Sequence, residues 1–129
     1  MPVNARVLAI DSDHWLHWME KELVKAGHSL VLRATNMESA LDLIRSGHPE
    51  TSRIDVAIFG VVIPSTPGAA VMNGGSGIVA GPEIAAALRK RLPGLKIIDF
   101  SSLDFKEASY ADFRVRPTVD NLAEAVTRV

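Results

Sequence analysis

Two carboxylates near the N-terminus are the first residues that could do chemistry. Asp11 and Asp13 follow a short apolar run, and Ser12 separates them. Carboxylate oxygens are the ligands that hard divalent cations such as Mg²⁺ prefer. Ser12 and Asp13 are also good helix caps, because their side chains accept hydrogen bonds from the free N–H groups of a first helical turn. The sequence therefore predicts either a weak magnesium site at Asp11 and Asp13 or an acidic turn that caps a helix.

A hydroxyl and a guanidinium follow two later apolar runs. Ser101 comes directly after residues 95–100, and Arg116 comes directly after residues 110–115. Both side chains can donate hydrogen bonds to the oxygens of an anion, and arginine does so with a planar fork. Beside Asp11, they would line a pocket for a small molecule or an anion. A hydrolase that uses Asp11 as its nucleophile is a weaker alternative, because no acid–base partner is evident.

Two histidines lie close to the same aspartates. His14 and His17 are three residues apart, which places them on one face of a helix that starts beside Asp11 and Asp13. Zinc or another transition metal accepts such ligands. The alternative, which we favour, is a pair of solvated surface histidines.

Two stretches could contact a partner protein. Trp15 and Trp18 lie three residues apart, off the predicted core face of a helix, and could anchor a partner or a homodimer. The alternative, slightly favoured, is that they pack against the neighbouring last helix of the chain. Asn73, Gly74 and Gly75 belong to a glycine-rich stretch whose N–H groups could cradle a phosphate. This stretch lacks the lysine of a Walker loop, which favours a mobile loop over a phosphate site. Such a loop is a candidate surface for a partner.

The elements that must position these residues follow from hydrophobic periodicity. Residues 56–63 form an unbroken run of apolar residues and glycine, rich in β-branched side chains and ended by Pro64, which indicates a strand buried on both faces. The pattern predicts strands at residues 6–10, 29–33, 54–63, 95–100 and 110–115. It predicts helices at residues 14–26, 37–46, 82–92 and from 118 or 120 to 129.

Strands that alternate with helices predict an α/β fold. Crossovers between parallel strands are right-handed, so the helices cover both faces of a doubly wound, flavodoxin-like (βα)5 sheet. Residues 65–81 read as a glycine-rich loop inserted within a single domain that spans residues 1–129. The connection from Ser101 to the fifth strand is short, so the fourth helix should be a stub or absent.

Two charged residues interrupt the last two strands. Asp99 and Arg114 stand where apolar residues are expected. They could pair with each other or face solvent at an edge.

Composition excludes several classes of protein. With 129 residues, 47% of them hydrophobic and 22% charged, the chain is long and apolar enough to bury a core as one globular domain. The net charge of −1 gives no electrostatic case for nucleic acid or an anionic membrane as a partner. There is no cysteine and no apolar signal segment at the N-terminus. We therefore expect a cytoplasmic protein without disulfides.

A set of landmarks occurs in a fixed order along the predicted strands. They are Asp11, Ser12 and Asp13 after the first strand, Asp55, Gly60, Pro64 and Gly68 along and after the third, Ser101 after the fourth, and Phe113, Arg116 and Pro117 at the fifth. This order resembles the receiver domains of two-component response regulators over essentially the whole chain.

The resemblance implies phosphoryl chemistry at the carboxyl ends of the strands. In that family an aspartate at the end of the third strand accepts a phosphoryl group from a histidine kinase, and two acids after the first strand help it hold Mg²⁺. A hydroxyl and a lysine then bond the phosphoryl oxygens. Here the acceptor position is Gly60, the second metal acid is Ser12, and the lysine is Arg116. Asp11, Ser101 and the switch aromatic Phe113 match.

These departures predict a pseudo-receiver, which is not an enzyme. No carboxylate occurs from Val56 to Pro82, so a register shift cannot restore the acceptor. We expect a signalling module of the phosphorelay family that is not phosphorylated on aspartate. It would need no cofactor and would act through contacts with a signalling or output protein, or with a second copy. The alternative is a regulatory domain that binds a small molecule or an anion at the strand carboxyl ends.

Overall fold

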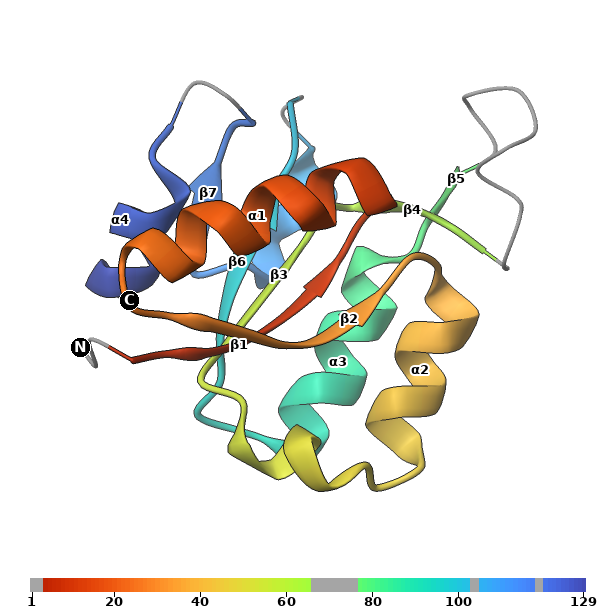
Figure 1. The fold of residues 1–129 in the computed structure, drawn as a ribbon. Helices are drawn as coiled ribbons and strands as arrows, with labels where there is room; N and C mark the ends of the chain where they lie inside the picture. The colour runs from red at the N-terminus through yellow and green to blue at the C-terminus, as the bar shows by residue number, and fades with distance from the viewer. Residues whose placement is uncertain (1–3, 66–76, 103–104, 118–119) are drawn as a thin grey trace.

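A five-stranded parallel sheet forms the middle layer of the protein. The computed structural model describes residues 4–65, 77–102, 105–117 and 120–129. The strand order is β2-β1-β3-β6-β7, which confirms the doubly wound α/β fold that the sequence predicts (Figure 1). The strands of this sheet are β1 (Arg6–Ile10), β2 (Ser29–Ala34), β3 (Val56–Phe59), β6 (Lys96–Phe100) and β7 (Phe113–Val115).

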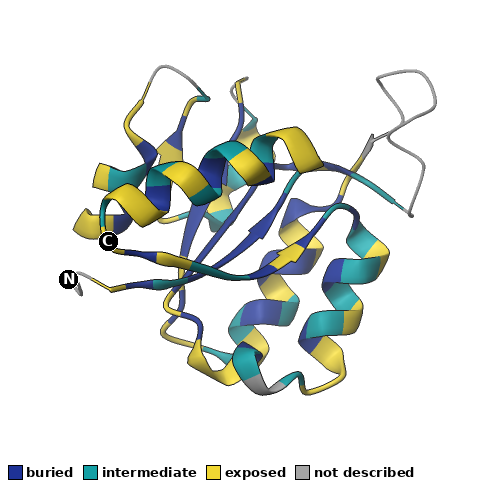
Figure 2. Cartoon of the chain, viewed as in Figure 1, coloured by how far each residue is buried: buried dark blue, intermediate teal, exposed yellow. Residues whose placement is uncertain are grey.

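In the part of the chain that the structure describes, four α-helices cover the sheet, two on each face. Helices α1 (Asp13–Lys25) and α4 (Leu122–Arg128) pack on one face. Helices α2 (Met37–Arg45) and α3 (Gly81–Arg91) pack on the other. The buried residues follow the sheet and the inner faces of these helices, and the exposed residues lie outside (Figure 2). Within the described residues, no helix is long and apolar enough to cross a membrane.

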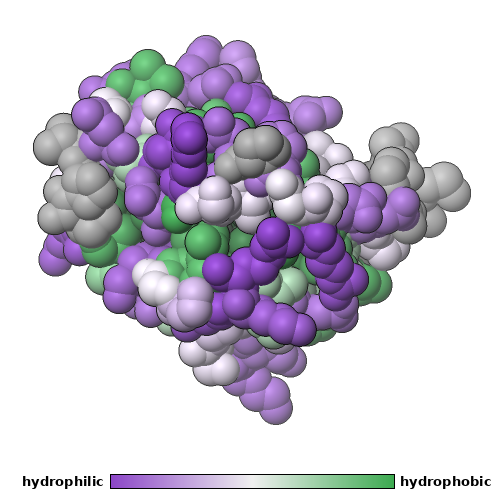
Figure 3. Space-filling model, turned by 90° about the horizontal axis from the view of Figure 1, so that it is seen from below, coloured by the Kyte–Doolittle hydropathy of each residue, from purple (hydrophilic) through white to green (hydrophobic). Residues whose placement is uncertain are grey.

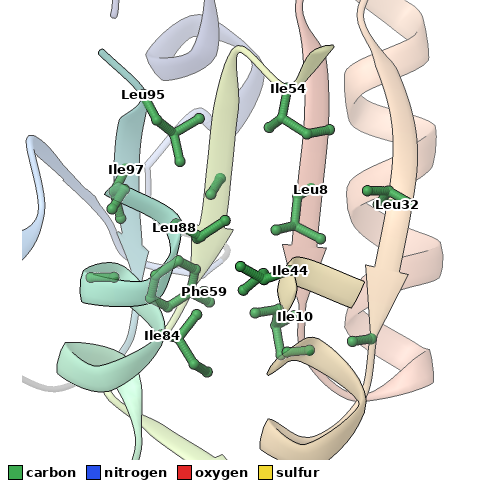
Figure 4. Packing of buried hydrophobic residues seen from close by; sticks show 14 of the residues in the cluster. Leu8, Ile10, Leu32, Ile44, Ile54, Phe59, Ile84, Leu88, Leu95 and Ile97 are labelled. Atoms are coloured by element: carbon green, nitrogen blue, oxygen red, sulfur yellow. The ribbon is translucent and has the colours of Figure 1, made fainter. Parts of the chain in front are cut away.

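The core has two halves because side chains alternate along each strand. In β1, Val7 and Ala9 point toward α1 and α4, whereas Leu8 and Ile10 point toward α2 and α3. Figure 4 shows the half of the core between the sheet and helices α2 and α3, where Phe59 lies among aliphatic side chains from α2, α3 and the neighbouring strands. All four residues of β3 have no exposed surface, so the predicted burial of this strand on both faces is confirmed.

The prediction of one continuous strand over residues 54–63 is wrong. β3 ends at Phe59, where it pairs with β1 and β6, and the chain then leaves the sheet. Residues Val62–Pro64 form β4, which pairs antiparallel with β5 (Gly77–Val79) in a separate two-stranded sheet. The N–H groups of Ala80 and Gly81 both donate to the carbonyl oxygen of Val61, each at 2.9 Å. These two hydrogen bonds hold the end of β5 next to the start of β4. The predicted loop 65–81 therefore contains a strand, and residues 66–76 lie outside the described part of the chain.

The caps of two helices test the sequence interpretation. Asn36 accepts a hydrogen bond from the N–H of Ser39 at 2.8 Å and caps α2 as predicted. At α4 the prediction of Thr118 or Asp120 is wrong in its position. Asn121 caps this helix by accepting from the N–H of Glu124 at 3.0 Å. The Asp120 carboxylate instead accepts from the N–H of Arg116, and residue 118 lies outside the described residues.

The described residues between β6 and β7 form no α-helix, which agrees with the predicted stub or absence of a helix in this connection. It contains a 3-10 helix, η3 (Lys106–Tyr110), and a similar short helix, η1 (Pro49–Arg53), precedes β3. The Tyr110 ring stacks on Phe59 with ring centroids 5.6 Å apart. The predicted strand at residues 110–115 is therefore too long: Tyr110 belongs to η3, and β7 begins at Phe113.

Candidate functional site

The carboxyl ends of β1, β3 and β6 meet at one edge of the sheet, where a cavity of about 360 Å³ opens. Of the predicted pocket residues, the structure brings together Asp11, Ser12, Gly60 and Ser101. The described residues that line the cavity are Ile10, Asp11, Ser12, Trp15, Gly60, Val62, Ile63, Pro64, Phe100, Ser101, Ser102, Phe105 and Pro117. Asp13 and Arg116, which the sequence also predicts in this pocket, are exposed and are not among these residues.

Gly60 leaves little room for a side chain at the expected acceptor position. A Cβ atom built there would lie 3.0 Å from Ser101 Oγ and 3.1 Å from the carbonyl oxygen of Phe100. Such contacts are tighter than ordinary van der Waals contact, so the neighbouring backbone or hydroxyl would have to move. The close approach of β3 and β6 thus matches the absence of a side chain at residue 60.

The Ser101 hydroxyl is occupied by a neighbour that the sequence analysis did not assign to it. It donates to Oδ1 of Asp99 at 2.7 Å. Asp99 is fully buried, and Oδ2 of the same carboxylate has no hydrogen bond among the described residues. Residues two apart on a strand share a face, so an acid two residues before a hydroxyl was the available signal.

Asp99 and Arg114 form the ion pair that the sequence analysis considered. Arg114 Nε lies 3.9 Å from Asp99 Oδ2, across neighbouring strands. Burial raises the pKa of Asp99, and the hydrogen bond from Ser101 and the charge of Arg114 oppose that increase without cancelling it. This carboxylate is therefore held in the fold at an energetic cost.

Asp11 is the acidic group of the cavity. Its Oδ1 accepts from the N–H of Ser12 at 2.7 Å, and burial nevertheless raises its pKa from 3.8 to about 6. A carboxyl group with this pKa is mostly ionised at pH 7. Ser12 precedes α1 but makes no side-chain cap, so the capping interpretation of this turn is not supported for Ser12.

Asp11→Asn is expected to raise the free energy of unfolding at pH 8 by about 1 kcal/mol, allowing for the part of the carboxyl that water reaches. The reason is that the folded pKa of about 6 exceeds the unfolded value of 3.8, so ionisation favours the unfolded chain as pH rises between them. Urea unfolding at pH 8 and pH 3 measures this, and the gain should vanish at pH 3. Asp13→Asn, at an exposed carboxylate, is the matched control. A stability loss at pH 8 for Asp11→Asn would contradict the argument.

The cavity fits Mg²⁺ poorly. This ion keeps several waters and is usually held by one or two carboxylates together with substrate phosphates. The described lining residues supply one carboxylate and no lysine or arginine that would hold a phosphate. Within the described ranges, no group of three or more histidine, cysteine or acidic residues could hold a metal ion, and His14 and His17 are exposed. Weak binding of Mg²⁺ at Asp11 and Asp13 stays a prediction.

The tryptophans pack inward as the favoured interpretation requires, although the aromatic ring that they contact belongs to Phe100 of β6 and not to the last helix. Trp15 and Trp18 are half-buried, and their rings lie 5.6 and 6.0 Å from the ring of Phe100. Trp15 also lines the cavity. Phe113, the proposed switch aromatic, is 41% exposed on β7. The remaining partner-surface residues, Asn73, Gly74 and Gly75, lie outside the described residues.

Known structures share this architecture, although sequence comparison finds nothing. No protein-family model matches the chain, and no curated protein shows significant similarity. A CheY-like response regulator receiver domain protein from Methanospirillum hungatei superimposes with a TM-score of 0.69 at 19% identity, over 97% of this chain and 92% of that one. The chemotaxis protein CheY4 of Vibrio cholerae gives a TM-score of 0.69 at 22% identity, over 98% of both chains.

A third structure is a complex. One chain in the crystal structure of the histidine kinase ThkA in complex with the response regulator TrrA matches with a TM-score of 0.65 at 24% identity, over 96% of this chain and 97% of that one. At these identities the likeness concerns architecture. The chain therefore has the fold of CheY-like response regulator receiver domains.

Proposed function

We propose that this chain is a receiver-like signalling module that works without phosphorylation on aspartate and is not an enzyme. The observation that carries the proposal is Gly60. It lies at the carboxyl end of the central strand, beside Asp11 and Ser101, where a nucleophilic carboxylate would have to stand. Without a nucleophile, aspartyl phosphate cannot form. The Ser101 hydroxyl already donates its hydrogen bond to the Asp99 carboxylate. Asp99 therefore takes the place that the oxygen of a bound anion would have as the acceptor.

The proposed mode of action is contact with a protein partner in the cytoplasm, either a signalling or output protein or a second copy. The receiver fold supports a signalling role, and one matching structure holds a response regulator bound to a histidine kinase. The net charge of −1 gives no support to a nucleic acid or anionic membrane partner.

The β4–β5 hairpin is the proposed contact surface, because the tryptophans are packed inward. Val62, Ile78 and Val79 are 45%, 43% and 56% exposed on this hairpin. No charged residue occurs between Val56 and Pro82, so the hairpin offers apolar surface without charge. At the opposite end of the sheet, hydrophilic side chains dominate and apolar areas show only between them (Figure 3).

An amide NMR titration tests the proposal most directly. The protein is titrated with Mg²⁺ and then with beryllofluoride, which mimics a phosphoryl group. With Mg²⁺ alone, only weak shifts confined to residues 11–13 are expected. The added beryllofluoride should give no saturable shift at residues 11–13, 60, 101 and 116, because the acceptor carboxylate is missing. Saturable shifts that spread from these residues to Phe113 would overturn the proposal and favour a pocket that still reports an anion.

Gly60→Asp is expected not to restore phosphorylation. The new Cβ would press on Ser101 and on the Phe100 carbonyl, and the described lining residues offer Asp11 alone as a further carboxylate. Intact-mass spectrometry after incubation with acetyl phosphate and Mg²⁺ measures the outcome. The wild-type chain should also stay unmodified, and a receiver domain that carries the strand-three aspartate is the positive control. Addition of a phosphoryl group to the wild-type chain would refute the proposed function.

A further inference from the structure

The charge of the cavity at the strand carboxyl ends is not what a phosphate site would need. Among its described lining residues, Asp11 carries the one charged side chain. The guanidinium of Arg116, which the sequence places in an anion pocket, is not part of that lining. The one formal charge in the described lining is therefore negative, which disfavours a phosphate or carboxylate ligand and favours a cation.

Three aromatic residues line the cavity, although Phe100 is only 4% exposed. Trp15 from α1, Phe100 at the end of β6 and Phe105 before η3 all line it. Trp15 and Phe100 are already fixed against each other in an edge-to-face contact with centroids 5.6 Å apart. The faces of such rings attract cations, most strongly for tryptophan. The site is therefore partly pre-organised, which lowers the entropic cost of binding.

The rest of the lining combines apolar side chains with serine hydroxyls. Val62, Ile63, Pro64 and Pro117 contribute aliphatic surface, and serine hydroxyls are the main further polar groups. A volume of about 360 Å³ is within the range of small-molecule sites, which are mostly apolar with a few placed polar groups. An inorganic cation would gain nothing from the apolar wall, whereas an organic cation would bury its carbon body there.

We infer that this cavity binds a small organic ammonium ion, with its charge against the Asp11 carboxylate and its apolar body between Trp15, Phe100 and Phe105. This ligand is a different chemical class from the phosphoryl group and the metal ion that matching folds suggest. The inference does not require the proposed function, since it concerns ligand binding and not the acceptor position.

Benzylamine is the probe for this site, with benzyl alcohol and benzoate as neutral and anionic analogues of nearly the same shape. In amide NMR and tryptophan fluorescence titrations, benzylamine should give saturable shifts at Asp11, Ser101 and the Trp15 indole. Benzyl alcohol should bind about tenfold more weakly, and benzoate should give no saturable shift. Equal affinities for benzylamine and benzyl alcohol, or no saturable benzylamine shift at these residues, would overturn the inference.

Two variants locate the binding. Asp11→Asn should weaken benzylamine binding about tenfold while leaving benzyl alcohol unaffected. Because this variant is expected to be more stable than the wild-type chain, weaker binding could not be assigned to unfolding. Asp13→Asn changes the exposed carboxylate two residues away and should leave both affinities unchanged. Equal losses in the two variants would mean general charge attraction and would refute a site at Asp11. The proposed function is tested by separate experiments, the titration with Mg²⁺ and beryllofluoride and the incubation with acetyl phosphate, so the two ideas can fail independently.

Discussion

Gly81→Ala is expected to lower the free energy of unfolding by about 2–3 kcal/mol. Alanine favours a helix over glycine by about 1 kcal/mol, so the intrinsic propensity alone would give the opposite sign. The packing decides the outcome. A Cβ atom at Gly81, the first residue of α3, would overlap the Tyr110 hydroxyl oxygen and lie 2.9 Å from the Val61 Cα. Urea or thermal unfolding measures the change.

Two further variants separate the contacts that cause this loss. Gly94→Ala is the matched control, because nothing lies within 4 Å of a Cβ at Gly94, and it should change stability little. Tyr110→Phe removes the buried hydroxyl, which has no hydrogen-bond partner in the described structure. In that background Gly81→Ala should cost less, although the contact with the backbone of Val61 remains. A Gly81→Ala protein as stable as the wild-type chain would show that this junction is loosely packed.

Asp99→Asn is expected to raise the free energy of unfolding at pH 8 by about 1 kcal/mol, because the buried charge that it removes costs more than the buried amide N–H groups that it adds. Asp99 is fully buried in β6, one of its oxygens lacks a hydrogen bond among the described residues, and its ion pair with Arg114 is long at 3.9 Å. Asparagine removes the charge and keeps an oxygen that can accept from Ser101. Arg114 loses little, because its side chain is 36% exposed and water can solvate it.

The pH dependence of this gain has a defined sign. Burial raises the pKa of Asp99 above its unfolded value of 3.8. The unfolded chain therefore releases its proton first, and ionisation lowers the stability of the wild-type protein as pH rises above 3.8. Urea unfolding at a series of pH values should show the advantage of Asp99→Asn growing with pH and disappearing in acid. A variant less stable than the wild-type chain at pH 8 would mean that the pair with Arg114 stabilises the fold.

Local patterns in the sequence predicted most of the elements. Alternation and periodicity located the strands and helices, because burial of one face imposes a period of two or 3.6 residues. The Asn36 cap was predictable because a cap depends on residues three positions apart. The gathering of Asp11, Gly60 and Ser101 was also predictable, since parallel strands bring their carboxyl ends to one edge.

Contacts between distant segments were not predictable in the same way. The run at 56–63 is uniformly apolar, so its sequence does not mark where the chain leaves the main sheet to form the β4–β5 hairpin. The orientation of Arg116 depends on the turn after β7, where its N–H donates to Asp120. The hydrogen bond from Ser101 to Asp99 depends on the burial of both side chains at the end of β6, which takes the packed fold to produce.

The sequence by itself determined the fold class and the absence of a carboxylate at the acceptor position, because both depend on residue type and order along the chain. Only the tertiary structure decided what the cavity is made of. Helix packing turned Trp15 inward against Phe100, and the edge geometry left Asp11 as the charged group of the described lining and Arg116 outside it. The physical reason is that the sign of the charge and the polarity of a cavity are set by which side chains the packed elements direct into it.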